Sequence, residues 1–490
     1  MTRKKEIFCT IFFNFFLQIV TAVCGFILPP IVIKTFGSSI NGMVASITQF
    51  ISYLNLVEVG VGGAAIVALY KPLAENDINE RNAILSATKG FFNKSGLLFS
   101  SLVIILSIIY PLLVSNEVKK SDAGLMVLVL GITGAAEFFL IGKYRVLLTA
   151  DKKLYVISLT QIIAVIVNTV AAIILIKLGF GILIVKLCSS LIYLSRYFLI
   201  RAYVKNKYPD LDLRVKPDKL AISHSKNVFV HSIAGFVVFN SPLVIITLFC
   251  SLKDASVYAV YAMIFAALNS LLSSFTTGMQ SFLGESLVKN DMENLRRQYN
   301  LFETTVFLIT FWTFSMAYIL LPSFISIYTR ELNDANYQQK MLGILFCVVG
   351  LMNNLRMPGV QLINGAGHFK ETQNRALLET IINLLGSVIF TILFGFRCIL
   401  IGSILSYGYR FFDIIIYSNR RILKEKSIKS FIKIVVLLLI FIAITFLINF
   451  FKVNITSYLN WMIYGVCVGF VYAVPVIPVL IKNIRKLKKW

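Results

Sequence analysis

Long apolar runs follow one another along the whole chain, separated by short charged or turn-rich breaks. Each run reaches the roughly 20 residues that a helix needs to cross the hydrocarbon core of a bilayer. The pattern therefore predicts an all-α polytopic membrane protein with about fourteen spans. The expected spans cover approximately residues 7–33, 40–69, 91–114, 123–148, 155–177, 179–200, 228–250, 255–283, 301–327, 340–364, 375–396, 399–418, 431–451 and 458–481.

The first apolar run follows a short basic segment, as the apolar part of a signal peptide does. It continues to Ile33, which is long enough to span, and no small-residue cleavage site follows it. We therefore expect it to remain as the first membrane helix.

Two short segments recur at nearly the same offset. Pro30 precedes Ile-Val-Ile and Pro242 precedes Leu-Val-Ile-Ile, while similar stretches end at Asp77 and Asp291, so both pairs are separated by almost the same length of chain. Six spans separate the copies, so the recurrence predicts two parallel six-helix lobes with a substrate path between them. The expected parts are an N-terminal lobe over 1–200, a cytoplasmic linker over 201–227, a second lobe over 228–418, and two accessory helices with a basic cytoplasmic tail over 431–490.

Composition supports the membrane class. Hydrophobic residues make up 58% of the chain and charged residues 14%, with a mean hydropathy of +0.81. Soluble domains are about 45–50% apolar and about 25% charged, so a cytosolic enzyme, a disordered chain and a secreted disulfide-rich domain are excluded. The net charge of +24 would suit a nucleic-acid binder, but the chain has too little polar surface for a soluble basic scaffold. We expect no nucleic-acid partner.

The position of the cations predicts the orientation. With the N-terminus in the cytoplasm, 36 of the 47 Lys and Arg residues fall on cytoplasmic loops and helix ends, nine fall outside, and Lys186 and Arg356 lie within spans. Cytoplasmic loops of membrane proteins carry such an excess of Lys and Arg. Both termini are therefore predicted to be cytoplasmic.

The chain shows no motif for nucleotide hydrolysis or metal binding. Its longest hydrophilic stretch, 201–227, is too short for a nucleotide-binding domain, and no GxxxxGK[ST] loop occurs. The seven cysteines are widely spaced, without a CxxC or Cys/His grouping. We expect no resident cofactor and no enzyme activity, which leaves a secondary transporter, a flippase or a channel.

Two carboxylates are expected at membrane depth, where an ionised group is costly and therefore a functional candidate. Glu58 lies in the second span just before Gly60, Gly62 and Gly63, which would allow an unwound helix beside the carboxylate. Glu137 lies near the middle of the fourth span. Both are candidates for coupling to H⁺ or Na⁺.

Three cations are candidate ligands of an anionic substrate. Lys186 and Arg356 have no acidic neighbour within a helical turn and lie too deep for easy snorkelling, so both are expected to face a cavity unpaired. Pro358 and Gly359 should interrupt the helix after Arg356. Arg145 lies nearer the cytoplasmic end of its span and either binds substrate or reaches the headgroups.

Four further charges have partners at helical spacing. Arg375 and Glu379 are spaced i, i+4, and Arg410 and Asp413 are spaced i, i+3. We expect two structural ion pairs, Arg375–Glu379 and Arg410–Asp413.

Several motifs follow one another in the order and spacing of a known superfamily. They are the stretch from Asn41 to Gly60, Leu69-Tyr-Lys-Pro-Leu-Ala, Gly142-Lys-Tyr-Arg-Val-Leu-Leu-Thr-Ala-Asp-Lys, Ser256-Val-Tyr-Ala-Val-Tyr, Arg356-Met-Pro and Gly367-His-Phe-Lys-Glu-Thr-Gln. On these motifs the chain resembles the multidrug/oligosaccharidyl-lipid/polysaccharide exporter superfamily. Within it, the chain is most similar to the polysaccharide-type, O-antigen-like flippases of lipid-linked oligosaccharides.

The resemblance implies two six-helix lobes that work by alternating access. Its implied substrate is an undecaprenyl-pyrophosphate-linked oligosaccharide, carried from the inner to the outer leaflet with the polyprenyl tail in membrane lipid. Glu58, Arg145 and Arg356 fall within the family-like motifs, whereas Lys186 does not. The two accessory helices depart from the twelve-span pattern and are similar to those of lipid II flippases, where they accommodate the lipid tail.

The leading hypothesis is a flippase for surface polysaccharide synthesis in a bacterial cytoplasmic membrane. A polysaccharide polymerase and glycosyltransferases are its expected partners. A drug/cation antiporter and a lipid II-type flippase remain alternatives within the superfamily. A non-transporting scaffold and a membrane glycosyltransferase remain alternatives outside it.

Overall fold

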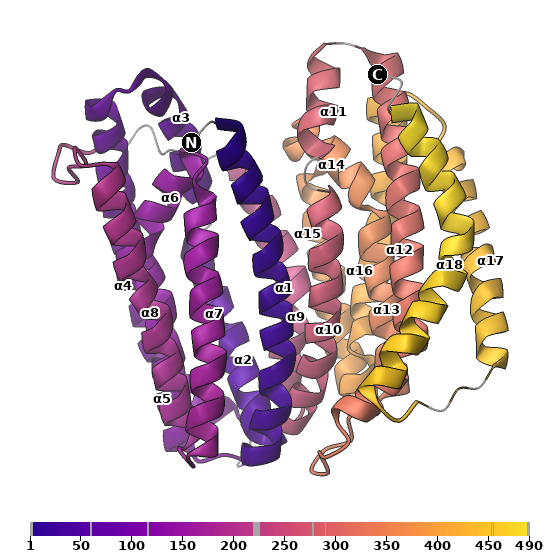
Figure 1. Cartoon of the computed structure of the whole chain (residues 1–490), viewed down its shortest axis with the longest axis horizontal. Coiled ribbons are helices and arrows are strands. Elements are labelled where there is room, and N and C mark those ends of the chain that lie inside the picture. Colours follow the sequence, from indigo (N-terminus) through magenta and orange to yellow (C-terminus); the bar gives the residue numbers. More distant parts are fainter. Residues whose placement is uncertain are drawn as a thin grey trace. The chain divides into compact units, whose positions relative to one another are not determined.

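The computed structural model describes residues 3–58, 61–114, 117–218, 226–276, 279–289, 291–451, 453 and 455–487, and the part it describes is all-helical (Figure 1). The chain divides into two compact units, Met1–Ile233 with Ile246–Ala259 and Ala234–Ile245 with Val260–Trp490. The division passes through the helices α9 (Lys226–Phe249) and α10 (Leu252–Thr276).

The first unit contains the helices from the N-terminus to the start of α9. They are α1 (Arg3–Phe36), α2 (Ser38–Leu54), η1 (Asn55–Glu58), α3 (Val61–Glu75), α4 (Ile78–Leu113), α5 (Lys120–Ala136), η2 (Glu137–Ile141), α6 (Gly142–Ala150), α7 (Leu154–Lys177) and α8 (Ile182–Lys207).

The second unit contains the helices that follow α10. They are α11 (Met279–Val288), α12 (Met292–Tyr328), α13 (Lys340–Leu355), α14 (Met357–Gly365), α15 (Phe369–Phe394), η3 (Phe396–Cys398), α16 (Leu400–Tyr417), η4 (Ser418–Leu423), α17 (Ile428–Phe450) and α18 (Tyr458–Leu487).

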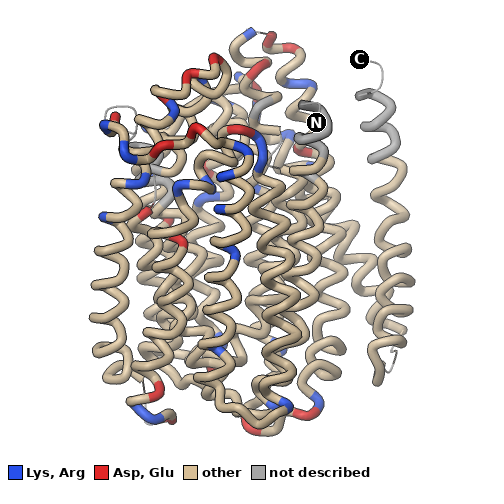
Figure 2. Tube along the Cα trace, turned by 60° about the vertical axis from the view of Figure 1, so that its left-hand side comes forward, with Lys and Arg blue, Asp and Glu red and all other residues tan. Residues whose placement is uncertain are grey.

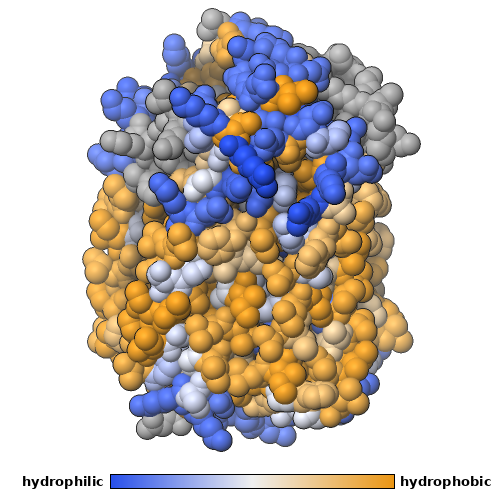
Figure 3. Space-filling model, turned by 90° about the vertical axis from the view of Figure 1, so that its left-hand side faces the viewer, coloured by the Kyte–Doolittle hydropathy of each residue, from blue (hydrophilic) through white to orange (hydrophobic). Residues whose placement is uncertain are grey.

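Within the described ranges, twelve helical stretches are long and apolar enough to cross a membrane, and the bent pair Ser38–Glu58 and Gly62–Glu75 makes a thirteenth if it is one span. The remaining expected span, 228–250, corresponds to α9, whose described apolar part is the shorter Ile233–Phe249. Charged residues gather toward the helix ends (Figure 2). On the face over α4, α5 and α8, a hydrophobic belt lies between hydrophilic ends (Figure 3). The all-helical, multi-span fold predicted from the apolar runs is confirmed.

The recurring aspartates begin equivalent long helices. The Asp77 carboxylate accepts a hydrogen bond from the Glu80 N–H at the start of α4 (2.9 Å), and the Asp291 carboxylate accepts one from the Asn294 N–H at the start of α12 (3.0 Å). Such a cap satisfies one of the amide groups that the first helical turn leaves without a partner. The same residue thus has the same structural role in each unit.

Part of the segment expected to be a cytoplasmic linker over 201–227 is bound to the first unit. α8 continues to Lys207, and beyond it the Asn82 and Ser86 side chains of α4 donate hydrogen bonds to the carbonyls of Asp210 (2.9 Å) and Val215 (2.8 Å). Burial, together with the neighbouring Asp151 carboxylate, raises the pKa of the Tyr208 phenol well above its usual value. Residues 219–225 of the expected linker lie outside the described residues.

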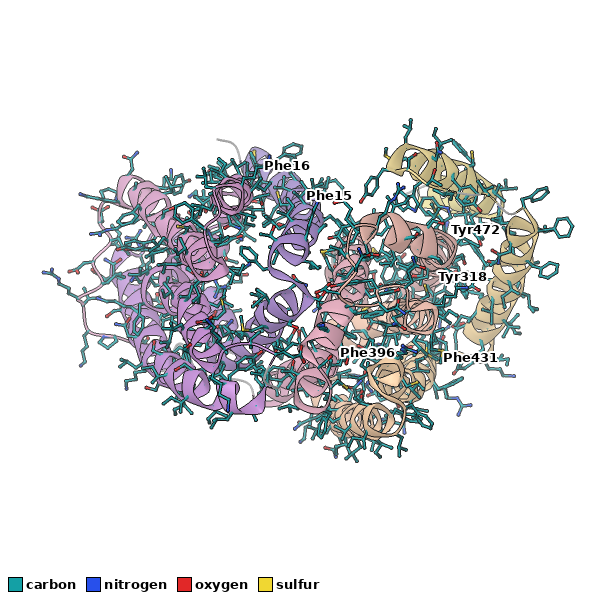
Figure 4. All side chains as sticks on the ribbon, turned by 90° about the horizontal axis from the view of Figure 1, so that it is seen from below. Phe15, Phe16, Tyr318, Phe396, Phe431 and Tyr472 are labelled. Atoms are coloured by element: carbon teal, nitrogen blue, oxygen red, sulfur yellow. The ribbon has the colours of Figure 1, made fainter. Side chains whose placement is uncertain are left out.

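The accessory helices α17 and α18 pack on α12 through large side chains. Tyr472 of α18 is fully buried, stacks on Phe441 of α17 with 5.5 Å between ring centroids, and shares a 2.6 Å hydrogen bond with Thr445. Figure 4 shows Tyr472 on the side of α18 that faces the other helices of the second unit. The Trp312 and Trp461 indoles add hydrogen bonds between α12 and α18. The two helices are therefore integral to the second unit.

Candidate functional site

The first unit contains a cavity of about 560 Å³ among α2, η1, α5, η2, α6, α7 and α8. Ligand sites typically occupy about 300–1,000 Å³. Its wall brings together four of the residues predicted from sequence, Glu58, Glu137, Arg145 and Lys186. The other lining residues are Thr48, Ile51, Ser52, Asn55, Leu130, Thr133, Gly134, Asn168, Ser189, Ser190 and Tyr193.

Breaks in helical geometry place both carboxylates on this wall. Glu58 ends the 3₁₀ turn η1 at the 45° bend before α3, and Glu137 begins the π-helical turn η2 between α5 and α6. Isolated π-turns are frequent at functional sites. A break beside Glu58 was predicted from its glycines, of which Gly60 lies outside the described residues. Gly134 and Gly142 flank the π-turn at Glu137 in the sequence, but glycines at these positions do not by themselves predict a π-turn.

Arg145 binds both carboxylates. One terminal nitrogen of its guanidinium contacts the Glu58 carboxylate, and the other lies 3.3 Å from Oε1 of Glu137. The three side chains are partly exposed to the cavity. Arg145 is therefore an ion-pair partner of the two carboxylates rather than a cation that reaches the headgroups. Its one positive charge is shared by two negatively charged carboxylates.

Lys186 is the cation of this cavity that has no ion-pair partner among the described residues. It lies on α8, is half-buried, and makes no hydrogen bond or ion pair with any residue that the structure describes. The Asn168 Oδ1 atom of α7, which also belongs to the cavity wall, is buried and accepts no hydrogen bond from the described residues. A free ammonium and a free amide oxygen give the cavity an unused donor and an unused acceptor.

Three lining residues of α8 share the face of Lys186. Ser189, Ser190 and Tyr193 follow it at i+3, i+4 and i+7, which places them on one side of the helix. This spacing is visible in the sequence and could have extended the predicted site. Asn168 could not be found in this way, because nothing in the sequence aligns α7 with α8.

In the second unit, Arg356 is not the unpaired cation that we expected. Its guanidinium binds the Glu379 carboxylate, lies 4.3 Å from the Tyr407 ring centroid and donates a 3.1 Å hydrogen bond to Asn353. The helix is interrupted there as predicted, with α13 ending at Leu355 and α14 starting at Met357. The prediction of an unpaired charge was wrong because the partner comes from another helix, α15, well beyond one helical turn along the chain.

The four residues of the two expected ion pairs belong to one larger network, in which only one of the expected pairs forms. Arg410 binds Asp413 as predicted, and its Nε atom also lies 3.3 Å from Glu379. Arg375 binds Asp413 instead of Glu379. The prediction of an Arg375–Glu379 pair was wrong because Glu379 is occupied by two arginines from α16 and from the α13–α14 break. With Arg356, the network holds three guanidinium groups and two carboxylates.

No group of three His, Cys, Asp or Glu side chains among the described residues could hold a metal ion.

Comparison with known proteins finds similar solved structures but no matching sequence family. No protein-family model and no curated protein sequence matches the chain. Among solved structures, the lipid II flippase MurJ in an inward closed conformation matches with a TM-score of 0.65 at 15% identity, over 96% of this chain and 99% of MurJ. An inward-facing multidrug resistance MATE family transporter of the MOP superfamily matches with a TM-score of 0.59 at 14% identity, over 82% of this chain and 94% of that one.

The chain shares their fold. A third structure, the MATE transporter ClbM in complex with Rb⁺, matches with a TM-score of 0.55 at 14% identity, over 88% of this chain and 96% of ClbM. The fold of these transporters is thus the fold of this chain, in agreement with the expectation from the motifs. Identities this low establish the fold and not the substrate.

The match to MurJ extends into the accessory helices. The 4% of this chain outside the match is about 20 of its 490 residues, which is fewer than the 23 residues of α17. The accessory helices are therefore at least partly matched in MurJ.

Proposed function

We propose that the protein is a flippase that moves undecaprenyl-pyrophosphate-linked oligosaccharide repeat units across a bacterial cytoplasmic membrane for surface polysaccharide synthesis. The observation that carries this proposal is the free ammonium of Lys186 on the wall of the first unit's cavity. An uncompensated cation at membrane depth is costly, so it is expected to serve a ligand. A pyrophosphate is a suitable ligand because it carries the opposite charge and several acceptor oxygens.

The neutral lining suits the sugar part of such a substrate. Serine, threonine, asparagine and tyrosine side chains line the same cavity as Lys186, and the Asn168 side-chain oxygen is available to accept a hydrogen bond from a hydroxyl. Sugar hydroxyls both donate and accept hydrogen bonds, as these side chains do. The polyprenyl tail would remain in membrane lipid.

We assign Arg145 a conditional role in binding. While Glu58 and Glu137 are both ionised, they occupy its guanidinium. Uptake of H⁺ or Na⁺ by either carboxylate would weaken that hold and release donors toward the pyrophosphate. This arrangement would couple substrate binding to an ion gradient, which is one of two drives open to a transporter without a nucleotide-binding motif; the other is consumption of the product outside.

Arg356 receives a different role from the one expected. Because Glu379 and Tyr407 engage it, we propose that it fixes the α13–α14 break and does not bind the substrate. The remaining elements of the proposal are unchanged. They are two lobes in alternating access, both termini in the cytoplasm, and a polymerase and glycosyltransferases as partners.

A drug/cation antiporter is the second candidate, because two carboxylates line the same cavity. It would require Glu58 and Glu137 to be free for a cationic ligand, whereas Arg145 occupies both. A lipid II-type flippase shares the pyrophosphate chemistry and differs in the group that the pyrophosphate carries.

Binding of undecaprenyl pyrophosphate to the purified protein tests the role of Lys186. Replacement of Lys186 with Gln should weaken binding about 10- to 100-fold, because a charged hydrogen bond contributes roughly 1.5–3 kcal/mol. Lys186→Arg should retain most of the affinity. Lys177→Gln is the matched control, because Lys177 lies at the exposed end of α7 and does not line the cavity. Unchanged binding by Lys186→Gln, or displacement by a cationic drug, would contradict the proposal.

A further inference from the structure

A second cavity, of about 650 Å³, lies in the second unit where α12 and α17 begin. These two helices pack against each other, and the π-helical turn η4 with the loop after it closes the cavity between them. Nothing in the proposed transport mechanism uses this cavity. We propose that it binds the phosphate headgroup of an anionic phospholipid of the surrounding membrane.

Cations predominate in and around this cavity. Its lining contains four of them, Arg296, Arg297, Lys429 and Lys433, against three carboxylates. The adjoining segment 420–433 contains six Lys and Arg residues and one carboxylate. Basic pockets between membrane helices at the headgroup level bind anionic lipids.

The carboxylates of the lining are largely occupied. Glu303 is almost fully buried, accepts a 2.7 Å hydrogen bond from Ser430 and lies 2.6 Å from the Lys433 ammonium. Glu425 lies 3.1 Å from the Lys429 ammonium and 3.8 Å from Arg296. Lys429 remains mostly exposed, so its other N–H groups are accessible to a phosphate.

An apolar strip leads away from the cavity along α17. Ile432 lines the cavity, and Val435 and Leu439 follow it at i+3 and i+7, so the three lie on one face of the helix. All three are more than half exposed, as lipid-facing side chains are. A basic cavity that continues into an exposed apolar helix face matches a phospholipid, with the headgroup in the cavity and an acyl chain along the strip. A soluble anion would contact only the basic cavity and not the apolar strip.

The full-length protein in detergent tests this site, with apparent affinities read from thermal unfolding during titration. The probes are phosphatidylglycerol, zwitterionic phosphatidylcholine and soluble glycerol 3-phosphate. Phosphatidylglycerol should bind at least tenfold more tightly than the other two. Lys429→Gln should weaken its binding about fivefold, and Lys429→Gln with Arg297→Gln about 25-fold, if each cation contributes about equally.

Lys289→Gln is a matched control. Lys289 is 68% exposed and Lys429 is 69% exposed, and each pairs with a glutamate at i, i+4, but Lys289 lies outside the cavity. Its replacement should leave phosphatidylglycerol affinity within twofold of the wild type. An equal loss in Lys289→Gln and Lys429→Gln would overturn the site, as would equal binding of the two phospholipids. Binding of glycerol 3-phosphate as tightly as phosphatidylglycerol would show a soluble-anion site instead.

Discussion

Replacement of Glu379 with Gln should lower the free energy of unfolding by about 3–5 kcal/mol, the usual loss when one partner of a buried ion pair is removed. The Glu379 side chain is 10% exposed, and it balances Arg356, which is 11% exposed, and Arg410, which is 7% exposed. With glutamine at this position, Asp413 would be the one carboxylate left in a network of three arginines. Denaturant unfolding in detergent measures the change.

Two further variants distinguish charge balance from a general effect of substitution. Glu285→Gln should show no measurable change, because Glu285 forms an exposed i, i+4 pair with Lys289. Adding Arg356→Gln to Glu379→Gln should recover part of the lost stability, because one unpaired charge is then removed. If Glu379→Gln were as mild as Glu285→Gln, the network would not contribute the stability assigned to it.

Replacement of Gly402 with Ala should destabilise the second unit by about 1–3 kcal/mol or more, through overpacking. At this position α16 crosses α15 so closely that an added Cβ atom would lie 2.1 Å from the Ser387 backbone nitrogen and 2.6 Å from the Gly386 carbonyl carbon. Backbone atoms cannot rotate away as a flexible side chain can, so the two helices would have to separate. The expected readout is a lower melting temperature and a lower yield of folded protein.

Gly235→Ala is the control for this glycine. Gly235 also lies in a helix of the second unit, but apart from the neighbouring backbone of its own helix, no described atom lies within 4 Å of the position of its added Cβ. Its replacement should leave the melting temperature unchanged or raise it, because alanine favours helix more than glycine does. If the two variants had equal stability, the close approach of α15 and α16 would be wrong.

The spans and several helix breaks follow from the sequence because their signals are local. An apolar run sets the length of a span, and Pro358 with Gly359 sets the break after Arg356. The cap at Asp291 repeats the cap at Asp77 for the same local reason. The expected span over 228–250 corresponds in the same way to α9, Lys226–Phe249.

The partners of the buried charges do not follow from the sequence. The i, i+4 rule favours Arg375–Glu379, but the rotation of α15 directs Glu379 toward arginines on other helices. Arg356 could be recognised as a buried cation, whereas its partner on a different helix could not. Lys186 was found by its depth alone, and its environment of Asn168 and Tyr193 depends on how α7 and α8 pack.

The most direct test of the central claim is transbilayer movement of an undecaprenyl-pyrophosphate-linked oligosaccharide in proteoliposomes, compared at equal protein incorporation for wild type, Lys186→Arg, Lys186→Gln and Lys177→Gln. We predict that Lys177→Gln moves the lipid like the wild type, that Lys186→Arg remains within severalfold of it, and that Lys186→Gln is at least about tenfold slower. Wild-type movement by Lys186→Gln, or export of a cationic drug without movement of the lipid, would contradict the account.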